Sequence, residues 1–426
     1  MPYPRGRNKE AILVKFRKLS VVKGCIDCRF CQYMVSCPEE YFVNWPIEGP
    51  QCTGCGICIG GCPTEALAME EVEEERTPVK ILLDGSAYQV PSGITVLTAL
   101  AMLGYKVSQF YGDGVVNRMC TSGACYNCCV LIDGQLKRSC VTPVEEGMTV
   151  ITDRDAVERY EPLRLASQIS AYLHPGVSCF THGCNLACSW CHNWDIAFSS
   201  VGNPLTPRQF VETIDKGAGN YSMLGISGGE PTLNRRWLIG FLKELRHRNR
   251  NLTMQLDTNA SILTKDYIDE LYCSGMTHIS PDMKAASVES FMSIAGVKDR
   301  QLAQFYLDRS WEAVKHIVNE YTGKLFYVVA IPYHPRLNSL EEVYRIGERL
   351  ASLNRDIDVN LVEYHPAFRA RGITPASQDM VQRAVNLLYD AGLRNVWLQG
   401  SEDAPSPLAP EDLMGNLCFK GGDLMS

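Results

Sequence analysis

From residue 176 onward, short apolar segments alternate with longer amphipathic ones. The longer segments, such as 235–248, 310–320 and 340–353, repeat apolar residues at the spacing of a helix, whereas the short ones are typical of buried strands. This alternation predicts an α/β fold with a parallel sheet, either open or closed into a barrel. The predicted strands cover residues 177–180, 223–227, 253–256, 278–280, 325–331, 360–362 and 395–398.

Residues 78–152 have a different, β-rich pattern. An apolar segment at 79–83 is followed by Asp84-Gly85 and by a second segment at 88–90, which predicts a hairpin. A helix is expected over 96–103 and a strand over 130–132. A charged linker over residues 70–77 and a second link near 153–172 delimit this part. We therefore expect three domains: 1–75, 76–152 and 153–426.

Composition and charge narrow the class of protein. The chain has 426 residues, of which 46% are hydrophobic and 21% charged, as in globular proteins with a substantial core. Its net charge of -7 argues against nucleic acid as a partner, because phosphate binding requires a basic surface. The sequence has no apolar run of transmembrane length, and residues 1–20 lack the apolar stretch of a secretory signal. We expect a cytoplasmic enzyme with no membrane partner.

Nineteen cysteines are the unusual feature of this composition. They lie in tight Cys-x-x-Cys groups within a long chain, a pattern more typical of metal binding than of disulfides. Two groups lie near the start: Cys52-x2-Cys55-x2-Cys58-x3-Cys62-Pro63 has the complete spacing of a bacterial ferredoxin, and the earlier group is a near copy with a longer last gap. In two-cluster ferredoxins the fourth cysteine of each run ligates the other cluster. We therefore predict one [4Fe–4S] site at Cys25, Cys28, Cys31 and Cys62, and another at Cys52, Cys55, Cys58 and Cys37.

This segment resembles a two-cluster ferredoxin. The alternative is a pair of zinc sites, which Cys-x2-Cys also serves. The number of cysteines, the prolines after the last cysteine of each run and the nearby glycines favour iron.

A third cysteine group has the spacing of a plant-type [2Fe–2S] site. It comprises Cys120, Cys125, Cys128 and the later Cys140, with Gly123 inside the loop, where backbone must approach sulfide closely. The stretch resembles the small β-grasp [2Fe–2S] domains that precede larger oxidoreductases. Cys129 is an alternative third ligand, although the spacing favours Cys128. Because all three sites are fully ligated by cysteine, we expect electron transfer; a purely structural role is the alternative.

The last group, Cys184-x3-Cys188-x2-Cys191, contains three thiolates. Three ligands on a four-iron cluster leave one iron open, as a catalytic site requires. At the end of the first predicted strand, this motif resembles the radical S-adenosylmethionine (SAM) superfamily. The resemblance implies that the open iron chelates the amino and carboxylate groups of SAM. One electron then cleaves SAM to methionine and a 5′-deoxyadenosyl radical.

The following strands end in further motifs, as expected for a site at the carboxyl ends of parallel strands. Each motif alone could be a turn or a helix cap, but four in succession favour a binding site. By the resemblance, Trp190 lies against adenine and His365 reaches SAM, while Lys284 contacts the ribose or carboxylate. The SAM amino group would bind at Gly228, Gly229 and Glu230, and its carboxylate side at Asp257, Thr258 and Asp282, in some members through a monovalent cation.

Over about residues 174–370, the motifs Trp190-Cys191-His192-Asn193, Asp257-Thr258-Asn259 and Asp282-Met283-Lys284 resemble glycyl-radical-enzyme activases of the pyruvate formate-lyase type. Ala260 and Met283 depart from that family's usual glycine and leucine. The resemblance implies a partial (β/α)6 TIM-like barrel, preceded by a ferredoxin-like α+β domain and the β-grasp domain. It also implies a protein substrate and an external low-potential electron donor of the ferredoxin or flavodoxin type. Two alternatives remain: modification, including methylation, of a small molecule or peptide side chain, and an electron-carrier subunit without catalysis.

Overall fold

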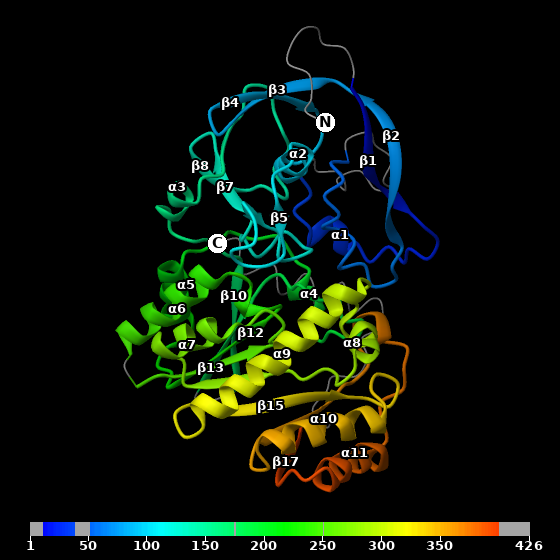
Figure 1. Cartoon of the computed structure of the whole chain (residues 1–426), viewed down its shortest axis with the longest axis vertical. Helices are drawn as coiled ribbons and strands as arrows, with labels where there is room; N and C mark the ends of the chain where they lie inside the picture. The colour runs from blue at the N-terminus through cyan, green and yellow to red at the C-terminus, as the bar shows by residue number, and fades with distance from the viewer. Residues whose placement is uncertain (1–11, 39–51, 174–175, 250, 400–426) are drawn as a thin grey trace. The chain divides into compact units, whose positions relative to one another are not determined.

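We analysed a computed structural model of the chain, which describes residues 12–38, 52–173, 176–249 and 251–399 (Figure 1). The chain has a mixed α/β fold and divides into two compact units. The first unit comprises Met1–Leu165, His182–Asn185 and Asp195–Thr206. The second comprises Ala166–Thr181, Leu186–Trp194 and Pro207–Ser426.

The first unit begins with a long antiparallel pair of strands, β1 (Ile12–Val21) and β2 (Leu67–Arg76). The prediction of a charged linker over residues 70–77 was therefore wrong. Its acidic residues lie opposite basic ones in the neighbouring strand, with Lys15 facing Glu73 and Lys18 facing Glu70. Opposite charges across an antiparallel pair are favourable, so this acidic segment is compatible with a strand. The two strands enclose the segment that carries the first eight cysteines and the short helix α1 (Phe30–Tyr33).

Arg76, at the end of β2, connects this strand pair to the next part of the same unit. Its guanidinium donates hydrogen bonds to the carbonyl oxygens of Ser92 and Gly93, at 3.0 and 2.7 Å. It also forms an ion pair of 3.1 Å with Glu74 and lies 3.9 Å from the ring centre of Phe16. Because its side chain is only 8% exposed, these contacts replace nearly all of its hydration.

A five-stranded mixed sheet follows, in the order β4-β3-β9-β7-β8 within the described residues. The predicted hairpin is present, and the predicted helix and third strand also form. Thr95 caps the helix by accepting a hydrogen bond from the amide of Thr98 at 3.2 Å. The elements are β3 (Pro78–Leu83), β4 (Ser86–Pro91), α2 (Val96–Met102), β5 (Val107–Ser108), β6 (Val116–Asn117), β7 (Cys129–Ile132), β8 (Gln135–Arg138) and β9 (Thr149–Ile151).

The second unit is built on one sheet, in which eight strands of the described residues run in the order β10 to β17. All neighbouring strands are parallel except β10, which pairs antiparallel with β11. Every strand predicted beyond residue 176 is present. The strands are β10 (Ala166–Leu173), β11 (Gly176–Thr181), β12 (Met223–Gly228), β13 (Thr253–Thr258), β14 (His278–Pro281), β15 (Phe326–Tyr333), β16 (Asp358–Glu363) and β17 (Asn395–Gln399).

Helices connect the parallel strands and pack side by side, α5 on α6, α6 on α7, α7 on α9, and α10 on α11 (Figure 1). Capping residues set where they start: Asn234 accepts from the amide of Trp237 at 3.2 Å, and Asp299 from that of Leu302 at 2.9 Å. The cap at Asp299 starts α9 ten residues before the helix predicted at 310. The helices are α3 (Arg154–Glu158), α4 (Trp194–Ala197), α5 (Pro207–Ala218), α6 (Arg235–Arg248), α7 (Lys265–Cys273), α8 (Val288–Ala295), α9 (Arg300–Tyr321), α10 (Leu340–Leu353) and α11 (Gln378–Asp390), with 3₁₀ turns η1 (Pro231–Leu233) and η2 (Phe368–Ala370).

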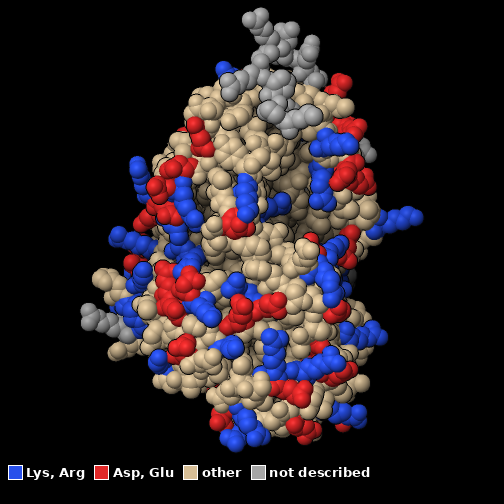
Figure 2. All heavy atoms as spheres, viewed as in Figure 1, with Lys and Arg blue, Asp and Glu red and all other residues tan. Residues whose placement is uncertain are grey.

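The link predicted at 153–172 is also wrong, because it contains α3 and most of the antiparallel edge strand β10. On the face shown in Figure 2, acidic and basic side chains are intermixed. Among the residues that the structure describes, no helix is long and apolar enough to cross a membrane.

Replacing Arg76 by alanine should weaken the connection between β2 and the Ser92–Gly93 turn. Losing charged hydrogen bonds to two half-buried carbonyls costs about 2–3 kcal/mol, so the amides of β2 and β3 should exchange with solvent about 30- to 160-fold faster. Hydrogen exchange followed by mass spectrometry measures this. Arg17→Ala, on the exposed side of β1, is the matched control. Equal exchange rates in the two variants would contradict the role assigned to Arg76.

Candidate functional site

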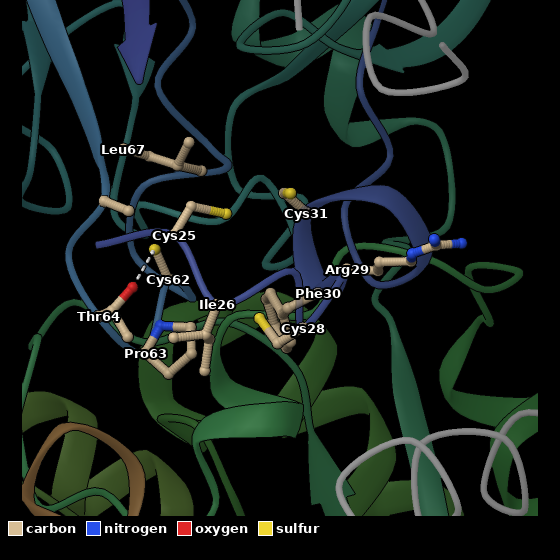
Figure 3. A pocket seen from close by; sticks show the side chains of 11 residues that line it. Cys25, Ile26, Cys28, Arg29, Phe30, Cys31, Cys62, Pro63, Thr64 and Leu67 are labelled. Carbon is tan, nitrogen blue, oxygen red and sulfur yellow. Dashed lines mark hydrogen bonds between the residues drawn. The ribbon is translucent and has the colours of Figure 1, made fainter. Parts of the chain in front are cut away.

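The first predicted [4Fe–4S] site corresponds to a pocket in the first unit (Figure 3). Its lining combines the first cysteine run with the last cysteine of the second run, as cross-ligation requires. The other lining residues are mostly apolar and come from α1 and from the segment that leads into β2. The four cysteines in the lining are Cys25, Cys28, Cys31 and Cys62.

Electrostatic contacts support both predicted sets of four. Burial raises the pKa of Cys31 to about 12, and the nearby Cys28 and Cys62 raise it further. Burial likewise raises the pKa of Cys58 well above its usual value, with contributions from Cys55, Cys52 and Cys37. Thiolates gathered in this way repel one another, so their joint ionisation requires bound positive charge. Iron supplies that charge, and the donor sets therefore fit [4Fe–4S] clusters.

Backbone geometry holds Cys52 in place within the second set. Its Sγ accepts hydrogen bonds from the amides of Leu19, in β1, and Gly54, both at 3.4 Å. Gly54 has a φ of +70°, and a Cβ there would lie 2.2 Å from the carbonyl oxygen of Arg17. Only glycine fits this approach, which brings the cysteine loop against β1.

The third group divides into two pairs of buried thiols. A hydrogen bond with Cys125 lowers the pKa of Cys120 to about 5, and one with Cys140 lowers the pKa of Cys128. All four side chains are buried. Two thiol pairs facing one another fit a centre of two irons, with two protein ligands on each iron.

The neighbouring Cys129 has different surroundings. It is the first residue of β7 and packs against an apolar cluster that includes Ala124, Tyr126 and Leu165. Cys128, by contrast, is hydrogen-bonded to Cys140. The geometry thus favours Cys128 over Cys129 as the third ligand of this group.

The motif Cys184-x3-Cys188-x2-Cys191 follows β11, and its three side chains are half-buried. Cys184 belongs to the first compact unit, whereas Cys188 and Cys191 belong to the second. Within the second unit the loop is fixed by backbone contacts: the amide of Ala187 donates to the carbonyl of Ala295 at 2.8 Å, and that of Arg369 to the carbonyl of Ser189 at 3.1 Å. These contacts hold the loop between the end of α8 and η2.

Aromatic rings surround the same loop. Trp190 is buried, and its ring lies 4.7 Å from that of His334. His192 stacks on His365 at 3.8 Å, and burial together with His365 lowers the pKa of His192 to about 4. His365 therefore lies next to the cysteine motif, as the resemblance implies, although 173 residues separate it from His192.

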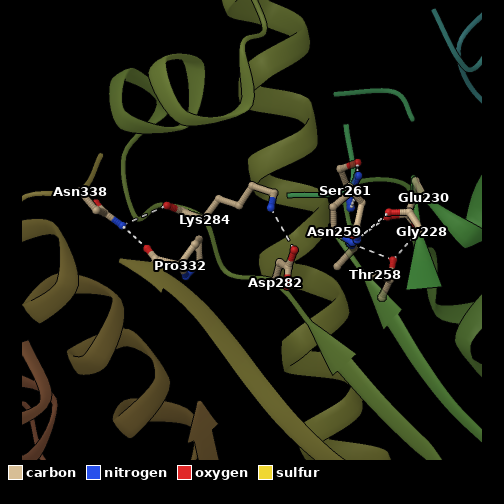
Figure 4. Close-up of polar contacts among 11 residues, drawn as sticks. Gly228, Glu230, Thr258, Asn259, Ser261, Asp282, Lys284, Pro332 and Asn338 are labelled. Carbon is tan, nitrogen blue, oxygen red and sulfur yellow. Dashed lines mark hydrogen bonds and ion pairs between the residues drawn. The ribbon is translucent and has the colours of Figure 1, made fainter. Parts of the chain in front are cut away.

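Glu230 is fully buried, and hydrogen bonds engage its carboxylate (Figure 4). Its Oε1 accepts from the side chains of Thr232 and Thr258, at 2.6 and 2.7 Å. Its Oε2 accepts from the amide of Asn259 at 2.7 Å. The carboxylate thus connects the loop after β12 to the end of β13. Gly228 lies close to β11, since a Cβ there would be 2.4 Å from the carbonyl oxygen of Thr181.

Asp257 lies at the end of β13, near other acidic groups. Burial raises its pKa to about 6, while a 3.0 Å hydrogen bond from Gln255 and another from Ser227 act in the opposite direction. The charges of Asp282 and Glu230 raise the pKa further. The sequence analysis did not identify Ser227 and Gln255, although Gln255 precedes Asp257 by two residues and therefore shares its face of the strand.

Lys284 forms an ion pair with Asp282 at 2.9 Å, and its side chain is only 5% exposed (Figure 4). Burial lowers its pKa, but Asp282, Tyr364 and Cys188 outweigh burial and raise the pKa well above the usual value. The ammonium group is therefore charged, and it lies close enough to Cys188 to lower the pKa of that thiol. The positive charge of Lys284 thus lies close to the Cys188 thiol of the motif.

The alanine at position 260, where the resembling family has glycine, has a structural consequence. Ala260 has a φ of +56°, in the left-handed region, where the resembling family carries glycine. An L-residue there costs about 1–2 kcal/mol. The turn keeps its shape because the Oδ1 of Asn259 accepts hydrogen bonds from the amide and hydroxyl of Ser261, at 3.0 and 2.6 Å.

No three or more His, Cys, Asp or Glu side chains of the described residues are arranged to hold a single metal ion. No disulfide joins the cysteines of the described part of the chain.

Comparison with known families agrees with the two most specific cysteine patterns. Residues 178–344 match the radical SAM superfamily, and residues 76–155 match a 2Fe-2S iron-sulfur cluster binding domain. The chain thus contains a radical SAM domain and, before it, an auxiliary iron–sulfur domain. The expected resemblances to the radical SAM superfamily and to a [2Fe–2S] domain are thereby confirmed, and these domains imply SAM, a [4Fe–4S] cluster and a further iron–sulfur cluster.

A shorter relative matches part of the chain. This relative is pyruvate synthase subunit PorD of Methanothermobacter marburgensis. The two proteins are 34% identical over 70 residues, which are 16% of this chain and 84% of PorD.

Solved structures show more distant likenesses. A domain of pyruvate-formate lyase-activating enzyme from Bacteroides vulgatus is 21% identical, with a TM-score of 0.34, over 41% of this chain and 98% of that one. SuiB of Streptococcus suis, bound to its precursor peptide SuiA, is 16% identical with a TM-score of 0.39, over 51% of this chain and 46% of that one. The family models, rather than these likenesses, identify the two domains.

Substituting Gly296 by alanine should disrupt the Cys188–Cys191 loop. Gly296 ends α8 with a φ of +67°, and a Cβ there would lie 2.3 Å from the carbonyl oxygen of Ala187. The loop must move away, so anaerobically reconstituted protein should lose about four irons, the content of one [4Fe–4S] cluster. Iron and sulfide analysis measures this.

Gly323→Ala is the matched control, because Gly323 has a similar φ of +78° but no atom within 4 Å of the added Cβ. A full iron content in Gly296→Ala would show that the loop does not depend on this contact.

Proposed function

We propose that this chain is a radical SAM oxidoreductase that cleaves SAM reductively for hydrogen abstraction and receives electrons through its own auxiliary clusters. The observation that carries the proposal is the position of the three-cysteine motif directly after β11, in a domain whose next strands end in Gly228, Asp257 and Asp282. These are the carboxyl ends of parallel strands, where such sheets bind their ligands.

The chain's own residues fit the catalytic cluster. Cys184, Cys188 and Cys191 are three thiols at the spacing of an open-iron site, and Lys284 places a positive charge beside Cys188. A [4Fe–4S] cluster bound there supplies the electron that cleaves SAM to methionine and a 5′-deoxyadenosyl radical. The roles of the protein are to hold that site, to orient SAM and to position the substrate.

The charges of the site residues indicate which part of SAM each residue binds. Asp257 and Asp282 form an acidic region that suits a monovalent cation beside the SAM carboxylate. Lys284, paired with Asp282, suits the SAM carboxylate or ribose, while Trp190 suits contact with adenine and His365, beside the cysteine loop, suits contact with SAM. Glu230 acts as a positioning residue, since its carboxylate holds Thr258 and Asn259 in place.

The front part of the chain supplies the auxiliary clusters. We assign residues 1–75 to a domain with two [4Fe–4S] clusters, 76–152 to the [2Fe–2S] domain and 153–426 to the catalytic domain, which forms a partial barrel. An external one-electron donor of low potential, of the ferredoxin or flavodoxin type, reduces these clusters. We further propose a cytoplasmic enzyme without membrane partners, and the net charge of -7 supports the absence of a nucleic-acid partner.

The substrate that we favour is another protein, on which the enzyme installs a glycyl radical. Support comes from the Trp190-Cys191-His192-Asn193 motif, the strand-end motifs and His365, which together resemble activases. The second candidate is modification, including methylation, of a small molecule or a peptide side chain. An electron-carrier subunit without catalysis is the third, and SAM cleavage distinguishes it from the others.

Anaerobic reconstitution of the full chain should yield about fourteen irons, for three [4Fe–4S] clusters and one [2Fe–2S] cluster. With dithionite and SAM, 5′-deoxyadenosine and methionine should form in equal amounts, as measured by liquid chromatography. Cys191→Ala should abolish cleavage and lose about four irons. Cys273→Ala, which removes an exposed thiol outside the motif, should do neither. Equal cleavage by wild type and Cys191→Ala would refute the catalytic assignment, and zinc in place of iron would refute the cluster assignments.

The activase proposal needs a test of its own. Incubation with SAM, dithionite and a glycyl-radical enzyme of the same organism should produce a doublet electron paramagnetic resonance signal on that partner. A partner whose radical glycine is replaced by alanine is the control. SAM cleavage without a signal on any such partner would rule out the activase and leave the second candidate.

SAM binding should weaken at acid pH because of Asp257. Its pKa is raised to about 6, so the carboxylate loses its charge as the pH falls through 6 and no longer holds the cation that offsets the SAM carboxylate. Affinity should be full above pH 7 and about fourfold lower at pH 5.5. Equilibrium dialysis of reconstituted protein with labelled SAM measures this. Asp257→Asn should bind more weakly but with little pH dependence; an unchanged pH profile in this variant would exclude Asp257 as the titrating group.

A further inference from the structure

The [2Fe–2S] loop lies against the residue that precedes the catalytic motif. Gly183, immediately before Cys184, has a φ of +88°. A Cβ on Gly183 would lie 3.2 Å from the backbone nitrogen of Cys125 and 3.4 Å from the Cβ of Cys120. His182–Asn185 belongs to the same compact unit as this loop. The backbone next to Cys184 therefore passes close to one thiol pair of the [2Fe–2S] site, with no more room between them than a methyl group fills.

The same loop also contacts the second [4Fe–4S] segment. A Cβ on Gly123 would lie 3.4 Å from Cγ2 of Ile57, which is buried between Cys55 and Cys58, and 3.9 Å from Sγ of Cys140. Arg118 donates a hydrogen bond of 2.9 Å to the carbonyl oxygen of Cys55. The [2Fe–2S] loop thus touches a [4Fe–4S] segment near Gly123 and the catalytic segment near Cys120 and Cys125.

Burial distinguishes this site from the first [4Fe–4S] site. Cys120, Cys125, Cys128 and Cys140 are all buried, whereas Cys25 is exposed. A centre enclosed by protein receives electrons from its neighbours more readily than from an external donor, because electron transfer slows steeply with distance. An exposed centre is accessible to a donor at the surface.

From these contacts we infer that the [2Fe–2S] site is the obligatory last relay, which takes electrons from the Cys52–Cys58 segment and passes them through Cys120, Cys125 and Gly183 to Cys184. This order rests on the proposed function, which requires reduction of the catalytic site. One electron moves at each step: the donor is oxidised by one electron, each relay is reduced and then reoxidised, and SAM accepts the electron as its carbon–sulfur bond breaks. The co-reactant is a one-electron reductant of low potential.

The test uses the full chain, reconstituted anaerobically, reduced with dithionite and freed of excess reductant by gel filtration. After SAM is added, samples are frozen at successive times and studied by electron paramagnetic resonance. The [2Fe–2S] signal is distinguished from the [4Fe–4S] signals by its slower relaxation. In wild type the auxiliary [4Fe–4S] signals should decay through the [2Fe–2S] site, and the [2Fe–2S] signal should disappear once they can no longer refill it, with one 5′-deoxyadenosine formed for each electron lost.

Cys140→Ala removes a [2Fe–2S] ligand, so the electrons of the two [4Fe–4S] sites should lose their path to SAM. The signals of these two sites should then decay at least tenfold more slowly after SAM is added. Cys129→Ala, beside the same site but outside the thiol pairs, should behave as wild type. Unchanged decay of the [4Fe–4S] signals in Cys140→Ala would overturn the inference.

The wild-type time course provides a second test that does not depend on a folded variant. A [2Fe–2S] signal that remains after the [4Fe–4S] signals have disappeared and SAM cleavage has stopped would also overturn the relay order. If wild type cleaves no SAM, the proposed function fails; if it cleaves SAM with the [2Fe–2S] site bypassed, only the relay order fails.

Discussion

Charge repulsion among gathered thiolates is the constraint on which the first unit depends. Burial and neighbouring thiolates raise the pKa of Cys31 and Cys58. Hydrogen bonds with Cys120 and Cys128, together with burial, raise the pKa values of Cys125 and Cys140. Without bound iron, most of these thiols must stay protonated in the folded unit. Cluster assembly releases those protons and replaces repulsion by metal–sulfur bonds, so part of the folding free energy of the unit comes from cluster binding. The close glycine contacts follow from the same constraint, because each loop must fold tightly around its centre.

In the second unit, by contrast, the charged groups of the site are mainly carboxylates at the ends of neighbouring strands. Glu230 is fully buried, and its hydrogen bonds give it a structural role. Asp257 has fewer partners and a pKa raised to about 6, so a ligand that brings positive charge gains the most there. Lys284 offsets Asp282, which leaves Asp257 as the carboxylate of this region whose ionisation is most readily favoured by a cation. The site is thus prepared for a ligand with both a cationic and an anionic group, as the amino acid part of SAM has.

The sequence predicted most of the strands, because these depend on the alternation of apolar segments along the chain. It failed where long-range pairing decided the structure. Residues 70–77 have the composition of a linker, and only the basic residues of β1, more than fifty positions earlier, make them a strand. The edge strand β10 was missed for a different reason, because polar residues interrupt the apolar run that marked the other strands, although its partner β11 follows it directly. The structural role of Glu230 could not be predicted from local sequence either, because its partners Thr258 and Asn259 lie at the end of another strand.

The proposed order of electron transfer follows the order of the chain. The cysteine segments occur as [4Fe–4S], [2Fe–2S] and catalytic motif, and each contact in the path joins consecutive segments: Ile57 with Gly123, then Cys125 with Gly183. Consecutive elements of a fold are usually neighbours in space, because short connections cost the least conformational entropy. A chain that carries redox domains in front of a catalytic domain therefore places the domain directly before the catalytic one beside the catalytic motif without further adjustment. On this argument the [2Fe–2S] domain became the relay because it immediately precedes the catalytic domain, and the glycines at 123 and 183 allow its loop to touch both neighbours.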